Sequence, residues 1–330
     1  MNIKSLLIGS AAALAVVSGA QAADAIVAAE PEPMEYVRVC DAFGTGFFYI
    51  PGTETCLRVG GEVRVTVSFD STDDDYDWDS AVRSRVYFDA RNDSEIGTIG
   101  SYIRLQGTNF GDVTIDQGYI TIGGFKIGAA YSFWDDIGIA GETDAFADLS
   151  GFRLASYTYA SDAFTVGVGV DDLSDVVGDY WSNAGSSEIG LQAMVSAALG
   201  PATVSLWGVY DFGAEDGAIY GKLAADVGPG TFELGAGWSS GENVYVSGIN
   251  AVSYEWTVAA AYAFKATDKL TITPSVSYWE GQNGADAWGA GLFAEYALAE
   301  GLTASATVDY LDADGLDDEW TGFVRLTRSF

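Results

Sequence analysis

The sequence predicts an all-β fold: a 16-stranded antiparallel transmembrane β-barrel. Three observations lead to this prediction. Apolar and polar side chains alternate along most of the chain, the alternating segments are even in number, and the connections between them alternate between long and short. Composition agrees, because 41 glycines, only 6 prolines and an aromatic content of 13% favour many strands joined by tight turns.

Charge and residue content exclude several functional classes. The chain has 15 basic and 47 acidic residues, a formal net charge of −32, and 48% hydrophobic residues. This combination fits neither a disordered acidic tail nor a nucleic-acid-binding protein. Histidine is absent, which removes histidine-dependent catalysis and most zinc sites. We therefore expect no enzyme activity, no catalytic residue, no bound metal and no cofactor.

The N-terminus has the features of a secretory signal peptide over residues 1–22. Lys4 precedes an apolar run from Leu6 to Val17, and Ala20-Gln21-Ala22 fits a cleavage site, with an uncleaved anchor as the alternative. No other stretch reaches 18 consecutive apolar residues, so membrane-spanning helices are not expected. Residues 23–56 are then an N-terminal arm on the periplasmic side, and residues 57–330 form the barrel.

Cys40 and Cys56 are the only cysteines, and both lie in this arm. Export to an oxidising compartment favours a disulfide between an even pair of cysteines. Two buried free thiols are the alternative. A long spacing without histidine does not make a metal site.

The alternation begins at Leu57, where one face carries valines and the other carries charged and hydroxylated side chains. The predicted strands are approximately 57–69, 80–91, 98–107, 113–123, 125–134, 152–160, 163–171, 187–199, 202–211, 217–227, 230–240, 252–265, 268–280, 286–298, 300–310 and 319–330. Long acidic connections at 70–79, 135–151, 171–186 and 311–318 alternate with short turns such as Gly123-Gly124 and Gly228-Pro229.

Two strands carry irregularities. Arg153, Tyr157 and Tyr159 share one face of the 152–160 strand, which leaves its orientation open, and Pro274 interrupts a strand that needs partners on both sides.

Aromatic residues near segment ends favour a membrane barrel over a soluble β-sandwich, which is the alternative fold. Tyr254 and Trp256 lie near one end of a segment, and Tyr262 and Phe264 lie near the other. This placement predicts two aromatic girdles at the membrane interfaces.

Basic residues gather on the polar face of neighbouring strands, six of them between Arg58 and Arg104. We expect them to form a positive wall that lines the interior: Arg58, Arg64, Arg83, Arg85, Arg91, Arg104, Lys126 and Arg325. The alternative is that these side chains only solvate the interior and pair with Glu62 or Asp89.

Several segments of the chain carry a resemblance to a known family. The leader MNIKSLLIGSAAAL, the stretches ADAIVAAEPEP and EYVRVCDAFGTGFFYIPGTETCLRVGG, the segments YITIGGFKIG and TITPSVSY, and the ending VRLTRSF resemble the general porins of alphaproteobacteria, especially the rhizobial and brucella-type group. The resemblance implies a trimeric, water-filled, sixteen-stranded barrel in the outer membrane. It also implies that the third long loop, Asp135 to Gly151, folds inward as a constriction.

An inward loop would set its acidic side chains against the basic wall and create a transverse field. These acids are Asp135, Asp136, Glu142, Asp144 and Asp148; a solvated loop outside the barrel is the alternative. The resulting expectation is a channel for passive diffusion of small hydrophilic solutes and ions, with weak cation selectivity. A plugged structural or adhesive barrel is the alternative function.

The last residue, Phe330, follows an alternating strand with Val324 and Leu326 on the same face. This ending resembles the signal read by outer-membrane assembly machinery. The expected location is the outer membrane of a Gram-negative cell, and the expected partners are membrane lipid, lipopolysaccharide, this machinery and two further copies of the chain.

Overall fold

The computed structural model describes residues 38–330 except 73–74, 175–187 and 250–251. The predicted signal peptide, residues 23–37 of the arm and most of the predicted 171–186 loop lie outside the described residues. Within the described part of the chain, no helix is long and apolar enough to cross a membrane.

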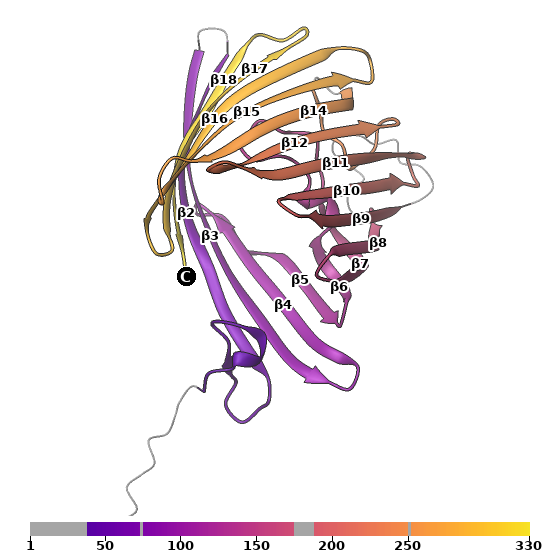
Figure 1. The fold of residues 1–330 in the computed structure, drawn as a ribbon, viewed down its shortest axis with the longest axis vertical. Helices are drawn as coiled ribbons and strands as arrows, with labels where there is room; N and C mark the ends of the chain where they lie inside the picture. The colour runs from indigo at the N-terminus through magenta and orange to yellow at the C-terminus, as the bar shows by residue number, and fades with distance from the viewer. Residues whose placement is uncertain (1–37, 73–74, 175–187, 250–251) are drawn as a thin grey trace, which may run out of the picture. The chain divides into compact units, whose positions relative to one another are not determined.

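Sixteen long strands account for most of the described residues (Figure 1). They are β2 (Cys56–Thr72), β3 (Asp75–Ser94), β4 (Gly97–Thr108), β5 (Thr114–Ile122), β6 (Phe125–Tyr131), β7 (Gly151–Ala160), β8 (Phe164–Asp172), β9 (Ile189–Leu199), β10 (Ala202–Asp211), β11 (Asp216–Val227), β12 (Gly230–Ser239), β14 (Val252–Lys265), β15 (Leu270–Gly281), β16 (Asp286–Ala299), β17 (Leu302–Ala313) and β18 (Glu319–Ser329). Two-residue strands β1 (Phe48–Tyr49) and β13 (Gly248–Ile249) and short 3-10 helices η2 (Asp41–Phe43) and η3 (Phe133–Asp136) complete the described elements.

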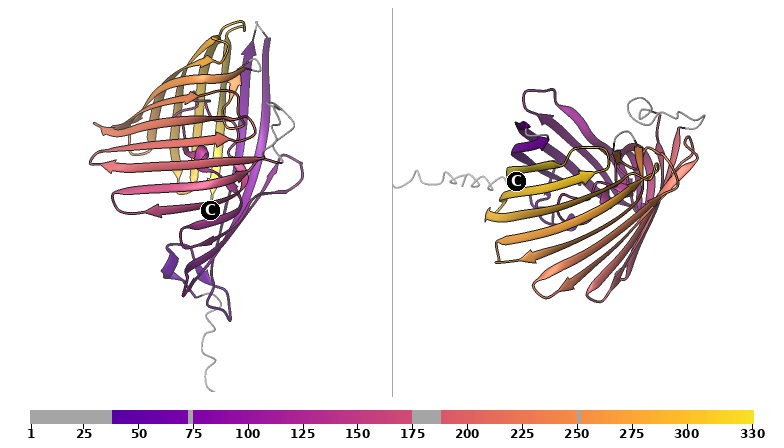
Figure 2. Two further views of the ribbon diagram at one scale, coloured as in Figure 1. Left: turned by 90° about the vertical axis from the view of Figure 1, so that its right-hand side faces the viewer. Right: turned by 90° about the horizontal axis from the view of Figure 1, so that it is seen from above.

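The long strands form one closed antiparallel sheet, which Figure 2 shows from two directions. Each strand pairs with the next along the chain, and β18 pairs with β2 from Glu319↔Thr72 to Ser329↔Glu62. Phe330 extends this seam, because its N–H donates to the Gly61 carbonyl and its own carbonyl accepts from the Gly61 N–H, each at 3.0 Å. Among the described long strands, closure leaves no unpaired sheet edge. The predicted sixteen-stranded antiparallel barrel is confirmed.

Four predicted strand ends are wrong because pairing continues or stops where hydropathy gave no sign. The first hairpin extends through most of the predicted 70–79 loop, since Asp70 pairs with Asp77 and the apolar pair Phe69↔Trp78 carries the alternation on. β17 likewise runs beyond the predicted 310. β6 ends at Tyr131 rather than 134, because the Ser132 hydroxyl accepts a hydrogen bond from the Trp134 N–H and starts η3.

Alternating faces resolve the ambiguous strand β7. Phe152 and Leu154 are buried, whereas Arg153 and Tyr157 are exposed, so the Arg153 face points outward. Pro274 also points outward and is exposed. It keeps its register with β16, whereas the β14–β15 pairing is interrupted at Pro274 itself and at Thr273, because proline has no N–H for the ladder.

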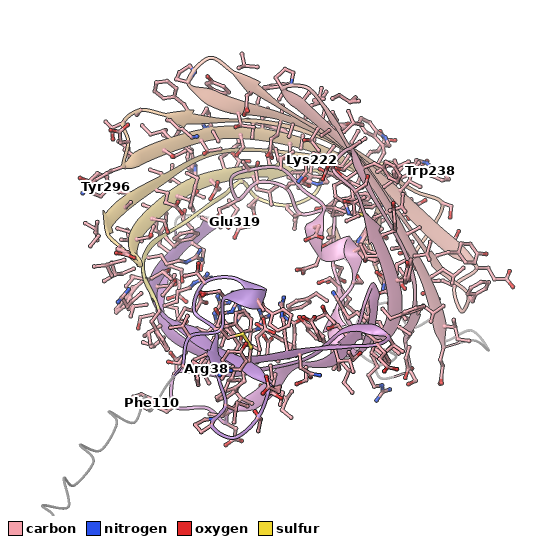
Figure 3. All side chains as sticks on the ribbon, turned by 60° about the horizontal axis from the view of Figure 1, so that its bottom comes forward. Arg38, Phe110, Lys222, Trp238, Tyr296 and Glu319 are labelled. Atoms are coloured by element: carbon pink, nitrogen blue, oxygen red, sulfur yellow. A yellow bond between two sulfur atoms is a disulfide. The ribbon has the colours of Figure 1, made fainter. Side chains whose placement is uncertain are left out.

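The outer surface carries aromatic side chains near both ends of the strands, although one predicted member is wrong. Tyr254 is only 5% exposed and stacks on Trp279 inside the barrel. The register shifts between Tyr254 and Trp256, and such a bulge turns the side chain to the other face. Trp238 and Tyr296 lie on the outside of the ring of strands in Figure 3.

The described part of the arm contains a small hairpin held by a disulfide between Cys40 and Cys56, with Cα atoms 5.9 Å apart. The disulfide prediction is confirmed, and the alternative of free thiols is wrong. Both cysteines are buried with Phe47. Since Cys56 starts β2, this cluster fixes the described part of the arm to the first strand at the end of the barrel that carries the short turns.

Candidate functional site

The segment between β6 and β7, residues 132–150, lies inside the ring of strands, as Figure 3 shows. We refer to it as the inner loop. Its two ends meet where the Ser132 N–H donates to the Ser150 carbonyl at 2.7 Å.

Between these ends the inner loop follows the inner face of strands β9 to β15. The Phe133 N–H donates to Gln192 Oε1 on β9 at 2.7 Å, and the Ala140 N–H donates to Glu233 Oε2 on β12 at 2.7 Å. Thr143 accepts from the Ser277 hydroxyl on β15 at 3.3 Å.

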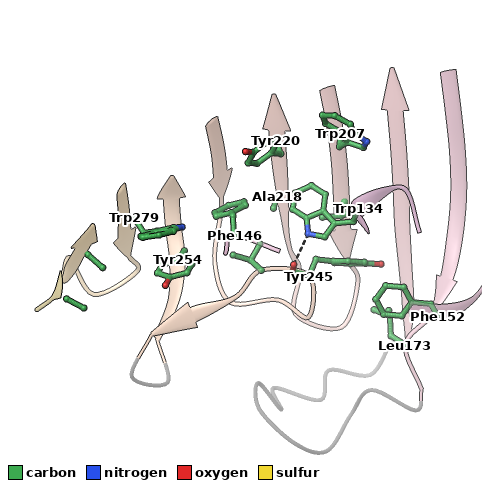
Figure 4. Packing of buried hydrophobic residues seen from close by; sticks show 14 residues of the cluster. Trp134, Phe146, Phe152, Leu173, Trp207, Ala218, Tyr220, Tyr245, Tyr254 and Trp279 are labelled. Carbon is green, nitrogen blue, oxygen red and sulfur yellow. Dashed lines mark hydrogen bonds between the residues drawn. The ribbon is translucent and has the colours of Figure 1, made fainter. Parts of the chain in front are cut away.

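Aromatic packing anchors the inner loop to this wall (Figure 4). Trp134 and Phe146 of the loop are 0% and 1% exposed, and the Phe146 ring lies 6.1 Å from that of Tyr220 on β11. A Cβ atom on Gly237 of β12 would lie 2.6 Å from Phe146 Cε1, so glycine is needed there for the ring to approach. Burial of such rings contributes about 2 kcal/mol each, which favours a docked loop.

A second inward segment, residues 240–247, braces the inner loop. Val246 forms a β-bridge with Ala147 of the inner loop. The Tyr245 carbonyl accepts from Trp134 Nε1 at 2.7 Å and from the Asp148 N–H at 2.9 Å. The Tyr245 hydroxyl in turn donates to Asp171 on β8 at 2.8 Å. Sequence reasoning missed this brace, and its only sign was a short apolar run, Val244 to Val246, within a loop.

The eight predicted basic residues lie on neighbouring strands of the opposite wall. Their positions are Arg58 and Arg64 on β2, Arg83, Arg85 and Arg91 on β3, Arg104 on β4, Lys126 on β6, and Arg325 on β18. In the closed sheet these strands run consecutively as β18, β2, β3, β4, β5 and β6. The set therefore forms one surface, which we call the basic wall.

Carboxylates within the basic wall pair with most of these arginines. Asp89 bonds Arg58 at 3.0 Å and Arg91 at 2.8 Å. Glu62 bonds Arg83 at 2.6 Å and lies within 4.0 Å of two further arginines. These arginines therefore cluster on one wall and also pair with Glu62 and Asp89, as the alternative interpretation expected.

Asp116 on β5 is a third carboxylate in this wall, and sequence reasoning missed it. It forms an ion pair with Arg104 and lies 3.9 Å from Arg85. Arg104 pairs with Gln117 and Leu105 pairs with Ile115, which leaves Asp116 as the extra residue of a bulge. A bulge places a side chain on a face that strict alternation does not assign to it.

The inner-loop acids take different positions. Glu142 lies 4.0 Å from Arg325 and so reaches the basic wall. Asp144 points to β11, where it accepts a hydrogen bond from the Tyr220 hydroxyl at 2.5 Å, and Asp135 accepts one from the Ser150 hydroxyl at 2.7 Å.

The remaining two loop acids are Asp136, the last residue of η3, and Asp148, near the end of the loop. The Asp136 carboxyl interacts electrostatically with Lys126 and Lys222. Asp148 contributes its backbone N–H to the brace.

Burial raises the pKa values of Asp136, Glu142 and Asp144 above those of free carboxyls. For Glu142, Arg325 opposes this effect without cancelling it. For Asp144, the Tyr220 hydrogen bond opposes it in the same way. These three acids therefore take up protons at a higher pH than exposed side chains do.

Similarity to known proteins covers nearly the whole chain. Residues 24–325 match the family model described as the porin subfamily. Putative outer membrane protein y4fJ of Sinorhizobium fredii is 43% identical, with 100% of this chain and 99% of that protein covered. Outer membrane protein IIIA of Rhizobium leguminosarum is 40% identical over 98% and 93%, and porin Omp2a of Brucella suis is 34% identical over 100% of both chains.

Solved structures share the fold at low sequence identity. The anion-selective porin from Comamonas acidovorans superposes with a TM-score of 0.66 at 12% identity, over 84% of this chain and all of that one. The trimer form of OmpT from Vibrio cholerae gives a TM-score of 0.64 at 14% identity, over 84% and 100%. A closed sixteen-stranded barrel with this family match identifies the chain as a member of the porin subfamily, an outer-membrane channel rather than an enzyme.

Proposed function

We propose that the chain forms a homotrimeric porin that lets small hydrophilic solutes and ions diffuse passively through three separate barrels. The observation that carries this proposal is the position of the inner loop. It lies against β9 to β15 and faces the basic wall across the barrel. A solute would therefore pass between loop and wall.

The charges of this passage support weak selectivity. Around it lie Arg64, Arg83, Arg85, Arg104 and Arg325, together with the acids Glu62, Asp116 and Glu142. Opposite charges at short range offset one another, and salt screens the more distant acidic residues of the chain. The five arginines exceed these three acids by two charges. We infer that the further inner-loop acids and the acidic residues at the channel mouths outweigh this excess and leave a weak preference for cations, strongest at low ionic strength.

Conductance in planar lipid bilayers tests the channel proposal. The protein is expected to give open steps in KCl, and proteoliposomes are expected to swell faster in small sugars than in large ones. An absence of conductance steps, together with liposomes that do not swell, would instead support a plugged structural or adhesive barrel.

Trimer assembly is part of the proposal. It is supported by the trimer form recorded for OmpT of Vibrio cholerae and by the short wall formed by β5 and β6, of 9 and 7 residues. A trimer-sized band on gels that collapses on heating is the expected result. A single monomer mass in mild detergent would contradict it.

We also propose that residues 1–22 are removed on export and that Phe330 takes part in recognition by the assembly machinery. N-terminal sequencing of protein from outer membranes is expected to begin at Ala23. Removing Phe330 is expected to reduce the amount of folded barrel, and equal amounts would contradict the second role.

A further inference from the structure

Three tyrosines form a continuous row on the inner face of the basic wall. The ring of Tyr102 on β4 lies 5.6 Å from that of Tyr87 on β3 and 5.0 Å from that of Tyr119 on β5. The ring planes differ by only 23° and 20°, so the rings are stacked. We call this set the tyrosine row.

The alternation of neighbouring side chains shows that the row faces the lumen. Phe88, Ile103 and Ile120 each follow one of the three tyrosines, and each is exposed on the outer surface at 38%, 46% and 54%. Consecutive strand residues point to opposite faces, so the tyrosines point inward. All three remain partly exposed, which leaves ring surface open to a solute.

Cations flank both ends of the row. The Arg58 guanidinium lies 5.6 Å from the Tyr87 ring centroid, and Lys126 Nζ lies 5.5 Å from that of Tyr119. Arg58 shares the single carboxylate of Asp89 with Arg91. Lys126 has no ion pair among the residues that the structure describes. Asp136 acts on Lys126 only at a longer range than an ion pair. Arg58, Arg91 and Lys126 therefore face two carboxylates, those of Asp89 and Asp136, and positive charge exceeds negative charge by one around the row.

An apolar ring surface bordered by excess positive charge suits a solute that carries both an aromatic ring and an acid group. Aromatic rings bind one another at these spacings, and cations near the ring edge attract a carboxylate. A simple anion would contact only the cations, and a neutral sugar would contact only the rings.

We propose that the tyrosine row is a binding site for aromatic carboxylates on the short-turn side of the inner loop. The inference deepens the proposed function, because it names a class of solute that the channel would favour. The row lies nearer to the start of β2 than the arginines around Glu62 do, so a solute would meet it after passing the inner loop from the long-loop side.

Fluorine NMR of 4-fluorobenzoate with the detergent-solubilised full-length protein tests this site, and it needs no open channel. Tyr102→Leu is expected to weaken binding about fivefold, the size of an aromatic contact. Tyr102→Phe keeps the ring and is expected to bind like the parent protein. Lys126→Gln is expected to weaken binding about threefold. Tyr157→Leu on the outer face is the matched control for detergent effects and is expected to change nothing.

Two further probes separate the contribution of the aromatic ring from that of the carboxylate. Trifluoroacetate, which has no ring, and 4-fluorobenzyl alcohol, which has no charge, are both expected to bind more weakly than 4-fluorobenzoate. Equal binding of either probe, or an equal loss in Tyr102→Phe and Tyr102→Leu, would overturn the proposal. Conductance in KCl is measured on the same samples. Open channels without ring-dependent binding would refute this site alone, whereas ring-dependent binding without conductance would refute the channel proposal alone.

Discussion

Replacing Glu142 with glutamine is expected to shift the permeability ratio of the channel toward anions. Glu142 is the inner-loop acid that lies 4.0 Å from Arg325, and its side chain is 39% exposed. An ion between the inner loop and the basic wall therefore passes close to this carboxylate. Glutamine has nearly the same shape, so the substitution removes charge without widening the passage.

The expected size of the shift follows from Coulomb's law. A monovalent ion about 6 Å from the carboxylate interacts with it by roughly 0.7 kcal/mol in water. Screening at physiological salt reduces this interaction to about 0.3 kcal/mol. Losing the charge lowers cation occupancy and raises anion occupancy by about 1.7-fold each, so the permeability ratio changes about threefold.

Reversal potentials across a salt gradient measure this ratio. Asp144→Asn is the matched comparison, because the Asp144 carboxylate is bound by Tyr220 and buried against β11. It is expected to change the ratio by less than about 1.5-fold, since its charge lies farther from the passage. An equal shift in both variants, or no shift with Glu142→Gln at low salt, would refute the assignment of Glu142 to the narrow part of the channel.

Three further predictions address pH, the disulfide and loop docking. Burial raises the pKa of Glu142, so acidification is expected to shift selectivity toward anions at a pH above the usual glutamate range; Glu142→Gln should lack that transition in reversal-potential measurements. Replacing Cys40 and Cys56 with serine is expected to cost about 3 kcal/mol of stability, measured as earlier unfolding in denaturant, and an unchanged midpoint would contradict this. Gly237→Val is expected to displace Phe146 and give noisier, altered single-channel conductance, whereas parent-like conductance would argue against a docked inner loop.

Strand count and strand order were predictable because membrane strands impose alternation with a period of two residues, and this period is visible in any one segment. Bulges were not predictable, since one extra residue reverses the facing of a side chain without changing composition. Asp116 and Tyr254 show this limit. Alternation did not identify Asp116 as a wall residue, and it assigned Tyr254 to an outer girdle although the residue packs inside.

The path of the inner loop depends on contacts between distant parts of the chain. Trp134 bonds the carbonyl of Tyr245, which lies more than a hundred residues later, and Val246 pairs with Ala147. Local hydropathy carries no information about such pairs. The resemblance to alphaproteobacterial porins gave the inward direction of the loop, whereas its docking partners became visible only in the structure.

Thiol labelling inside an open channel tests the central claim, that solutes pass between the inner loop and the basic wall. The two native cysteines form a disulfide, so Glu142→Cys introduces a single reactive thiol. Adding a negatively charged methanethiosulfonate to conducting channels is expected to lower their conductance irreversibly in discrete steps, while Tyr157→Cys on the outer face is expected to show no change. Unchanged conductance in Glu142→Cys channels that mass spectrometry shows to be fully labelled would contradict the claim.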